Sequence, residues 1–224
     1  NDLRGDSFKG KTVVISGSGN VAMYACKKAY DLGAKVLAMS DSNNAVYDPN
    51  GINYLTMKRI KEEERGRIKE YADAFSGVKY LENQKPWGIK CDCAFPSATQ
   101  NEISGADAKI LVKNGCKLVC EGANMPSAPE AIEIFQKNGL LYAPGKASNA
   151  GGVATSGLEM SQNSERLAWS AEKVEENLHQ IMINIHKNCY ETAKKYGCPG
   201  NYVVGANISS FLKIADSMLD QGVM

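Results

Sequence analysis

The sequence has no long apolar run and almost no excess of charge of one sign. No stretch approaches the roughly 18 consecutive apolar residues that a membrane-spanning helix needs. The 26 Lys and Arg residues nearly balance the 25 Asp and Glu residues, so the net charge is +1. This balance gives no electrostatic reason to expect a nucleic acid or a membrane as partner. The polar N-terminus, NDLRGDSFKGK, also lacks the apolar core of a secretion signal.

Histidine is scarce, and the cysteines lack the spacing of a metal site. The chain has two His residues, and its Cys residues stand at positions 26, 91, 93, 116, 120, 189 and 198. Cys91/Cys93 and Cys116/Cys120 are close pairs, but neither has the two-residue spacing of common zinc knuckles. Several cysteines fall inside apolar runs, where Cys packs as a small hydrophobe. We therefore expect no metal site, and reduced thiols in a cytoplasmic protein.

The chain does have the size and composition of an ordinary globular protein. Its 224 residues, 43% of them hydrophobic and 23% charged, suffice for one large domain with a continuous core. Short apolar runs alternate with helical periodicity up to about residue 150. Strands are expected at 11–16, 35–40, 77–81, 91–95, 116–120 and 140–144, helices at 20–32, 53–75, 103–115 and 128–138, and a turn-rich stretch at 41–51.

After residue 150 the alternation ends and the sequence becomes helical. A long helix is expected from Ser170 to about Lys195, and a last helix at about 206–220, with CPGN between them. The whole pattern predicts a doubly wound, Rossmann-like α/β fold: a mostly parallel sheet with helices on both faces and a C-terminal helical tail. We expect one domain over 1–224, with its core in 1–155 and the tail and hinge region in 156–224.

A glycine loop, GSGNVA at 17–22, follows the first expected strand and matches G-x-G-x-x-A. The first Gly permits a tight turn, the second lets the backbone approach a phosphate, and the Ala lets helix and strand pack closely. Amides of the helix that begins near Asn20 would face a pyrophosphate. The alternative is a plain tight turn. The strand before the loop, the helix after it and an acid, Asp41, 24 residues after Gly17 together favour a dinucleotide site.

The residues around Asp41 leave the choice of dinucleotide open. An acid at the end of the second strand favours NAD, because it accepts hydrogen bonds from the ribose 2′-hydroxyl. Ser40 and Ser42 flank it, however, and both could donate to a 2′-phosphate. Further positive charge is available from Lys61, Arg65 and Arg67. The alternative for these three is a solvated helix face paired with the acidic run 62–64.

Four further stretches carry a more specific pattern. They are KPWGIKCDCAFPSATQNEI (85–103), CEGANMPSAPEA (120–131), YAPGKASNAGGVATSGLEMSQNSERLAWS (142–170) and NYVVGANISSFLKIADSMLDQG (201–222). With SGSGNVA, they closely resemble the coenzyme-binding half of hexameric bacterial glutamate dehydrogenases. The resemblance extends over essentially the whole chain, and NAGGVATSGLEMSQN is stronger support for it than the glycine loop.

The resemblance implies reversible oxidative deamination of L-glutamate to 2-oxoglutarate and ammonia. The SDS motif at 40–42 resembles NADP-using members, so NADP is the expected cofactor and NAD the alternative. The cofactor-binding residues that the resemblance implies are Gly17, Ser18, Gly19, Asn20 and Val21 at the pyrophosphate, and Ala98, Thr99, Asn124 and Asn149 at the nicotinamide and its ribose. Ser40, Asp41, Ser42, Lys61 and Arg67 are expected at the adenosine end of the cofactor.

The substrate-binding residues that the resemblance implies are Ser156 and Val153. A buried hydroxyl costs free energy unless it is paired, so Ser156 indicates a polar substrate end such as the glutamate side-chain carboxylate. A leucine, phenylalanine or valine dehydrogenase is the alternative enzyme, and Ser156 argues against it. A non-catalytic nucleotide-binding module is the other alternative.

No catalytic residue is expected in this chain. The family's catalytic lysine and aspartate belong to an N-terminal substrate domain, and we expect that domain to be absent here; Lys146 is expected to have a structural role. The chain alone should therefore be inactive. A homohexamer is expected of the full-length enzyme, whereas this chain is expected to be a monomer with Ile208, Phe211, Leu212 and Ile214 partly exposed.

Overall fold

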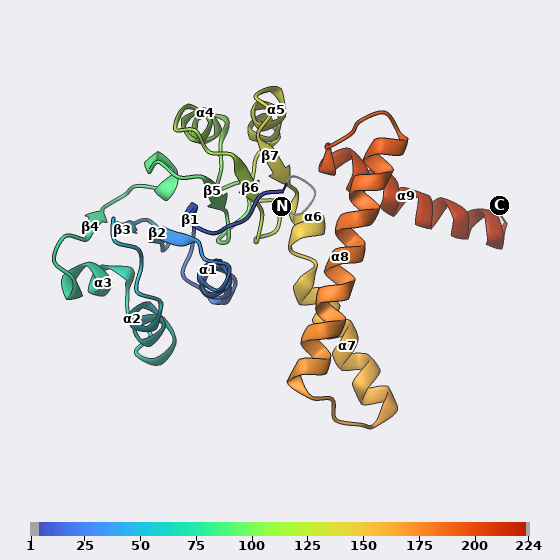
Figure 1. Ribbon diagram of the computed structural model, residues 1–224, viewed down its shortest axis with the longest axis horizontal. Coiled ribbons are helices and arrows are strands. Elements are labelled where there is room, and N and C mark those ends of the chain that lie inside the picture. Colours follow the sequence, from blue (N-terminus) through green and yellow to red (C-terminus); the bar gives the residue numbers. More distant parts are fainter. Residues whose placement is uncertain (1–4, 223–224) are drawn as a thin grey trace. The chain divides into compact units, whose positions relative to one another are not determined.

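The computed structural model describes residues 5–222 (Figure 1). Its contacts divide the chain into two compact units, one ending at Tyr142 and the other beginning at Ala143. Each unit is described by itself below. The expected single-domain organisation stays a prediction.

The first unit is built on a seven-stranded sheet in the order β4-β3-β2-β1-β5-β6-β7. The strands are β1 Thr12–Ile15, β2 Lys35–Ser40, β3 Ala45–Tyr47, β4 Lys79–Leu81, β5 Cys93–Phe95, β6 Leu118–Cys120 and β7 Leu141–Ala143. β1 pairs in parallel with β2 and β5, and β5 with β6, whereas β3 is antiparallel to β2 and β4. The predicted mostly parallel α/β sheet is confirmed.

Helices cover both faces of this sheet, as predicted. They are α1 Asn20–Asp31, α2 Tyr54–Lys58, the π-helix η2 Arg59–Glu63, α3 Ile68–Ala74, the 3₁₀ helix η3 Pro86–Gly88, α4 Gly105–Lys113 and α5 Pro129–Lys137. α4 and α5 lie side by side on one face and α1 lies on the other (Figure 1). α1 buries Ala22, Met23, Cys26 and Ala29 at helical spacing, because this face of the helix packs on the strands.

The strand order reverses at β1. From β1 the chain runs outward through β2, β3 and β4, and then returns to form β5 on the other side of β1. In open α/β sheets a ligand crevice forms at the carboxyl ends of the strands where the order reverses. The glycine loop directly follows β1, so the fold places it at this point.

The expected turn-rich stretch at 41–51 was wrong in part, because it contains β3. Ala45 and Val46 are fully buried, and β3 pairs with β2 through a short hairpin loop. The amide of Asp41 donates to the carbonyl of Asn44 (2.9 Å), which closes that loop. A strand of three residues among Asp, Asn and Pro is too short to give a period-two signal.

The single helix expected at 53–75 was also wrong. α2 passes directly into η2, and the chain then leaves the helical conformation before α3 begins. Arg65 has a positive φ of 52°, and Arg67 is extended with ψ of 156°. The carboxylate of Glu70 lies close over Gly66 and accepts the backbone amide of Arg67 (2.8 Å), which fixes the start of α3. Charge periodicity alone did not reveal this break.

The second unit is helical, as expected. It contains α6 Gly145–Ser148, α7 Gly151–Glu165, α8 Ala171–Lys195 and α9 Tyr202–Gln221. Ser170 caps α8 by accepting the amide of Lys173, whereas α9 begins about a turn earlier than predicted because Asn201 caps it. A Cβ on Gly205 would collide with the Cys189 carbonyl, so α8 and α9 pack closely there.

The apolar side chains of α9 are exposed, as expected. Phe211 and Ile214 are 66% and 61% exposed, and Ile208 and Leu212 are partly buried. Within residues 5–222, no helix combines the length and the apolar character needed to span a membrane.

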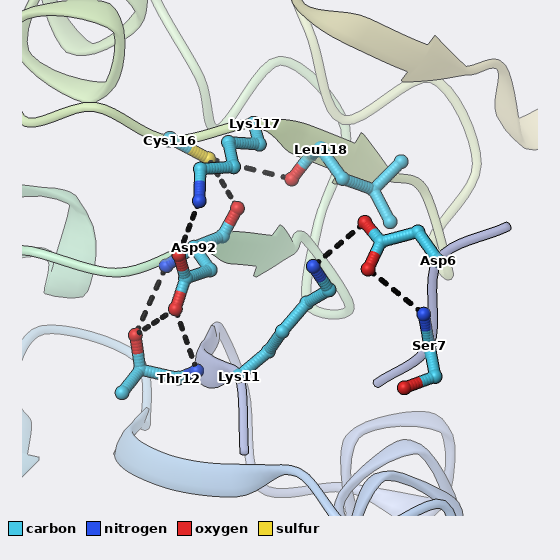
Figure 2. Close-up of polar contacts among 8 residues, drawn as sticks. All are labelled: Asp6, Ser7, Lys11, Thr12, Asp92, Cys116, Lys117 and Leu118. Atoms are coloured by element: carbon cyan, nitrogen blue, oxygen red, sulfur yellow. Dashed lines mark hydrogen bonds and ion pairs between the residues drawn. The ribbon is translucent and has the colours of Figure 1, made fainter. Parts of the chain in front are cut away.

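The amino-terminal edge of the sheet is held by the Asp92 carboxylate (Figure 2). One carboxylate oxygen accepts the backbone amide (3.0 Å) and hydroxyl (2.9 Å) of Thr12, and the other pairs with Lys117 Nζ (3.2 Å). These residues begin β1 or directly precede β5 and β6. Burial would raise the pKa of Asp92, but the hydrogen bonds from Thr12 and Lys117 outweigh it and lower the pKa below its ordinary value of 3.8. The carboxylate therefore fastens three neighbouring strands.

Asp92→Asn should lower the free energy of unfolding at pH 7 by about 1 kcal/mol, because the amide keeps the shape but loses the charge. The lowered pKa means that the stabilisation by Asp92 is complete above pH 3.8 and is lost as the pH falls through its pKa in the folded protein. Urea unfolding of D92N and of the unmodified chain at pH 7 measures the loss of stability, and the same comparison at pH 2.5 measures how much of the difference remains. Asp6→Asn is the control, because the exposed Asp6 carboxylate pairs with Lys11 and accepts the amide of the adjacent Ser7 rather than joining strands. An undiminished difference between D92N and the unmodified chain at pH 2.5 would contradict this account.

Candidate functional site

A cavity of about 860 Å³ lies at the carboxyl ends of β1, β2 and β5 in the first unit. Its size falls within the roughly 300–1,000 Å³ of small-molecule sites. Ten of the predicted cofactor residues line it: Gly17, Ser18, Gly19, Ser40, Asp41, Ser42, Lys61, Arg67, Ala98 and Thr99. The other lining residues, which are not among the predicted site residues, are Asn43, Asn83, Gln84, Lys85, Pro86, Ser97, Gln100, Asn101 and Glu102.

The glycine loop leaves backbone amides available at one wall of the cavity. Gly17 has a φ of +84°, and a Cβ there would lie 3.2 Å from both Ala98 Cβ and the Ser97 carbonyl oxygen. At Gly19 a Cβ would meet nothing within 4 Å, so the backbone lies open. α1 begins after Gly19 without a side-chain cap. Its first-turn amides and the positive end of its dipole can therefore meet an anion. Asn20 and Val21 are exposed beside this wall.

Ser40 has a contact that its sequence position did not suggest. Its hydroxyl oxygen accepts the backbone amide of Gly17 at 2.9 Å, and the residue is only 5% exposed. The hydroxyl thus joins the end of β2 to the glycine loop. The expected contact between Ser40 and a 2′-phosphate stays a prediction.

Asp41 lines the cavity, and its carboxylate also accepts hydrogen bonds within the hairpin of β2 and β3. Its Oδ1 accepts the backbone amide of Asn44 (3.3 Å) and, weakly, the side-chain amide of Asn44 (3.4 Å). Asn44 in turn accepts the amide of Asn83 at 3.1 Å. These contacts occupy part of the acceptor capacity that a ribose 2′-hydroxyl would use. Ser42 is exposed at the tip of the same hairpin.

Lys61 and Arg67 come together at the cavity because the helix breaks between them. Lys61 Nζ donates to the carbonyl of Gly66 (2.8 Å), and Arg67 is exposed. The alternative was that the neighbouring glutamates neutralise these cations. Glu62 and Glu64 instead pair with Lys58 (3.9 Å) and Arg59 (3.6 Å). π-Helical turns such as η2 are frequent at functional sites.

The loop after β5 forms the opposite wall and is organised by Glu102, which the sequence analysis missed. Its Oε1 accepts the amides of Ala98 (3.1 Å) and Thr99 (3.4 Å). Burial raises the pKa of this carboxyl, although hydrogen bonds from Ser16, Ala98 and Thr99 partly oppose the shift. Lys85 Nζ donates to the Glu102 carbonyl oxygen (2.7 Å). The only sequence signal was an acid three residues after Thr99.

Asn124 lies on the loop after β6, next to the β5 loop. The amides of Gly122 and Ala123 donate to the Pro96 carbonyl at 2.9 and 3.0 Å. Deeper in this loop, the buried Glu121 carboxylate accepts the Ser127 amide (3.2 Å) and the Tyr142 hydroxyl (2.6 Å). Asn124 itself is exposed and does not line the cavity.

The remaining predicted residues belong to the second unit. Asn149 caps the end of α6, and Val153 is 73% exposed on α7. Ser156 is exposed as well, and its hydroxyl donates weakly to the Gly152 carbonyl (3.4 Å) within the helix. The argument from a buried hydroxyl therefore does not hold for this chain, and the roles of these residues stay predictions. Lys146 hydrogen-bonds Asn207 on α9.

Most of the cysteine side chains are buried in the described part of the chain. All seven cysteines are free thiols, and burial raises the pKa of Cys26 and of Cys93 to about 12. Within residues 5–222, no cluster of three His, Cys, Asp or Glu side chains could hold a metal ion.

The fold and the glycine loop define a doubly wound α/β nucleotide-binding domain. A family model described as Glutamate/Leucine/Phenylalanine/Valine dehydrogenase matches residues 1–222. The chain belongs to this dehydrogenase family.

Individual relatives agree with the family match. The chain is 55% identical to the NAD(P)-specific glutamate dehydrogenase of Xylanibacter ruminicola over 98% of its length, and 55% identical to the NADP-specific glutamate dehydrogenase of Haemophilus influenzae over 98%. The glutamate dehydrogenase of Plasmodium falciparum superposes with a TM-score of 0.95 at 50% identity and covers the whole chain. In each comparison the chain spans only about half of the relative, 50%, 50% and 49% respectively.

Ser40→Ala should destabilise the first unit by about 1–3 kcal/mol, because the buried Gly17 amide would lose its acceptor. Ser42→Ala removes an exposed hydroxyl from the same hairpin and should change stability by less than about 0.5 kcal/mol. Urea unfolding of both variants, followed by far-UV circular dichroism, gives the comparison. Equal stability of S40A and S42A would show that the Ser40–Gly17 contact does not hold the loop.

Proposed function

We propose that this chain supplies the coenzyme-binding part of a glutamate dehydrogenase and binds NADP. The observation that carries the proposal is the cavity itself, in which uncapped amides of a glycine loop lie on one wall and two cations on another. A dinucleotide needs these two kinds of contact at its diphosphate and at its 2′-phosphate. The names of the relatives support the same proposal.

The residues of the cavity divide into three groups along such a ligand. The amides after Gly17 and Gly19 bind the diphosphate, with Asn20 and Val21 at the start of α1. Ser42, Lys61 and Arg67 bind the 2′-phosphate beside Asp41. The loop of Ala98 and Thr99, with Asn124 next to it, holds the nicotinamide end.

When bound, the nicotinamide would exchange a hydride with the substrate in the reversible deamination of glutamate to 2-oxoglutarate and ammonia. In the second unit, Asn149 would contact the nicotinamide ribose, and Ser156 and Val153 would contact the substrate. The proposal extends to a cytoplasmic homohexamer of the whole enzyme.

NADP rather than NAD is favoured by the state of Asp41. A free carboxylate at this position would accept the 2′-hydroxyl of NAD and repel a 2′-phosphate. Here Asn44 occupies part of that carboxylate, while Lys61 and Arg67 stand at the same cavity. The two positive charges of Lys61 and Arg67 therefore outweigh the negative charge of Asp41 at this end of the cavity.

Arg67→Ala and Lys61→Ala should each weaken NADPH binding by about ten- to a hundredfold, because each removes a charge-assisted contact worth about 1.5–3 kcal/mol. NADH binding should change by less than about threefold, because NADH lacks the 2′-phosphate. Fluorescence titration with both nucleotides measures the two affinities. Arg65→Ala is the matched control, since Arg65 lies between the two and does not line the cavity. Equal losses for NADH and NADPH would refute the phosphate assignment.

The chain alone should not sustain reduction of NADP by glutamate, because we assign the catalytic groups to the part of the relatives that it does not match. Absorbance at 340 nm during incubation with glutamate and NADP tests this. Addition of the separately purified N-terminal half of the H. influenzae relative should restore turnover. Sustained activity of the chain by itself would overturn the assignment.

A further inference from the structure

Glu102 is an acid in the wall of a cavity that we assign to a polyanion. It is the last lining residue of the loop after β5, and its carboxylate is turned back onto that loop. The groups that contact the carboxylate are neutral: the amides of Ala98 and Thr99 and the hydroxyl of Ser16. A carboxylate at this place costs binding energy for every phosphate that enters the cavity. Its presence therefore needs a physical explanation.

The hydrogen bonds of Glu102 explain how it could hold the loop in either charge state. One oxygen, Oε1, accepts both backbone amides. The second oxygen could then carry a proton without breaking either of these contacts. A protonated Glu102 would thus keep the loop in place while removing its negative charge from the cavity.

The surrounding charges leave Glu102 sensitive to an anionic ligand. Lys85 is the cation that faces it, but Lys85 Nζ also pairs with Asp107 (2.8 Å), so much of its charge is neutralised there. Asp41, Lys61 and Arg67 line the same cavity on the side of β2 and η2. Burial already raises the pKa of Glu102 above its ordinary value, and a nearby diphosphate would raise it further.

We propose that Glu102 is a positioning residue that holds the Ala98–Thr99 turn and takes up a proton from solvent when a dinucleotide enters the cavity. This rests on the proposed dinucleotide binding. Binding should be tightest at low pH, where Glu102 is already protonated. It should weaken as the pH rises through the window between the pKa of the free protein and the higher pKa of the complex.

Two substitutions separate the charge of Glu102 from its geometry. Glu102→Gln keeps an oxygen that can accept both amides but cannot ionise. Glu102→Asp keeps the charge but is one methylene too short to reach the turn. Glu133→Gln is the control, because it removes the same charge from an exposed pair with Lys137 on α5, outside the cavity. Each protein is titrated with NADH, which lacks the titratable 2′-phosphate, at several values between pH 5.5 and pH 8.5.

The unmodified chain and E133Q should bind NADH more weakly at pH 8.5 than at pH 5.5, by up to about tenfold for each unit by which NADH raises the pKa of Glu102. E102Q should lose this dependence and bind at pH 8.5 as tightly as at pH 5.5. E102D should keep the dependence but bind about tenfold more weakly throughout, because the turn loses its support. If Glu102 only supported the turn, E102Q would not lose the pH dependence that E102D keeps.

Calorimetry of the unmodified chain in two buffers of different ionisation enthalpy provides a measurement that needs no variant. Proton uptake on NADH binding is expected over the pH range in which the affinity falls. A pH dependence in E102Q equal to that of the unmodified chain, or binding without proton uptake, would overturn the role of Glu102 while leaving dinucleotide binding intact. Absence of saturable binding to the unmodified chain would instead overturn the proposed function and this inference with it.

Discussion

The candidate site depends on the backbone of Gly17 being held between its two neighbouring strands. From β2, the Ser40 hydroxyl accepts the Gly17 amide. From β5, Ser97 and Ala98 approach so closely that no side chain fits at Gly17. Ser16, next to Gly17, accepts the Ser97 amide at 2.9 Å. Because the loop is fixed from both sides, the amides that follow it point out of the sheet at one defined place.

The sheet is fastened at both of its edges, by different means. At the amino-terminal edge the ionised Asp92 joins β1, β5 and β6 through charge-assisted hydrogen bonds. At the carboxyl edge the loops are joined by hydroxyls, amides, the partly buried acid Glu102 and the buried acid Glu121. Charges that are paired with cations stabilise the fold, whereas acids held by neutral donors stay responsive to what binds nearby. This difference distinguishes the amino-terminal edge of the sheet from the edge that carries the candidate site.

Much of the architecture could be predicted from local pattern. The run at 11–16 followed by GSGNVA indicated a strand, a phosphate-binding turn and a helix, because each of these depends on residues that are adjacent in the sequence. β3 and the break at 64–67 could not be predicted in this way. β3 is a strand only because β2 offers it a partner. The break contains Arg65 in the left-handed conformation and the cap of Arg67 by Glu70, and neither leaves a periodic signal in the sequence.

The sequence by itself determined the family, the class of fold and ten of the residues that line the cavity, because glycine spacing and strand ends are local signals. Only the tertiary structure decided how the side chains of those residues are used. In the folded chain the Ser40 hydroxyl accepts the Gly17 amide, the Asp41 carboxylate accepts the Asn44 amide, and the Glu102 carboxylate turns back onto Ala98 within the loop after β5. The Ser40 contact joins segments that meet only when β1 and β2 pack side by side. The other two contacts lie within single loops, and the side-chain partner in each is set by the folded conformation of that loop.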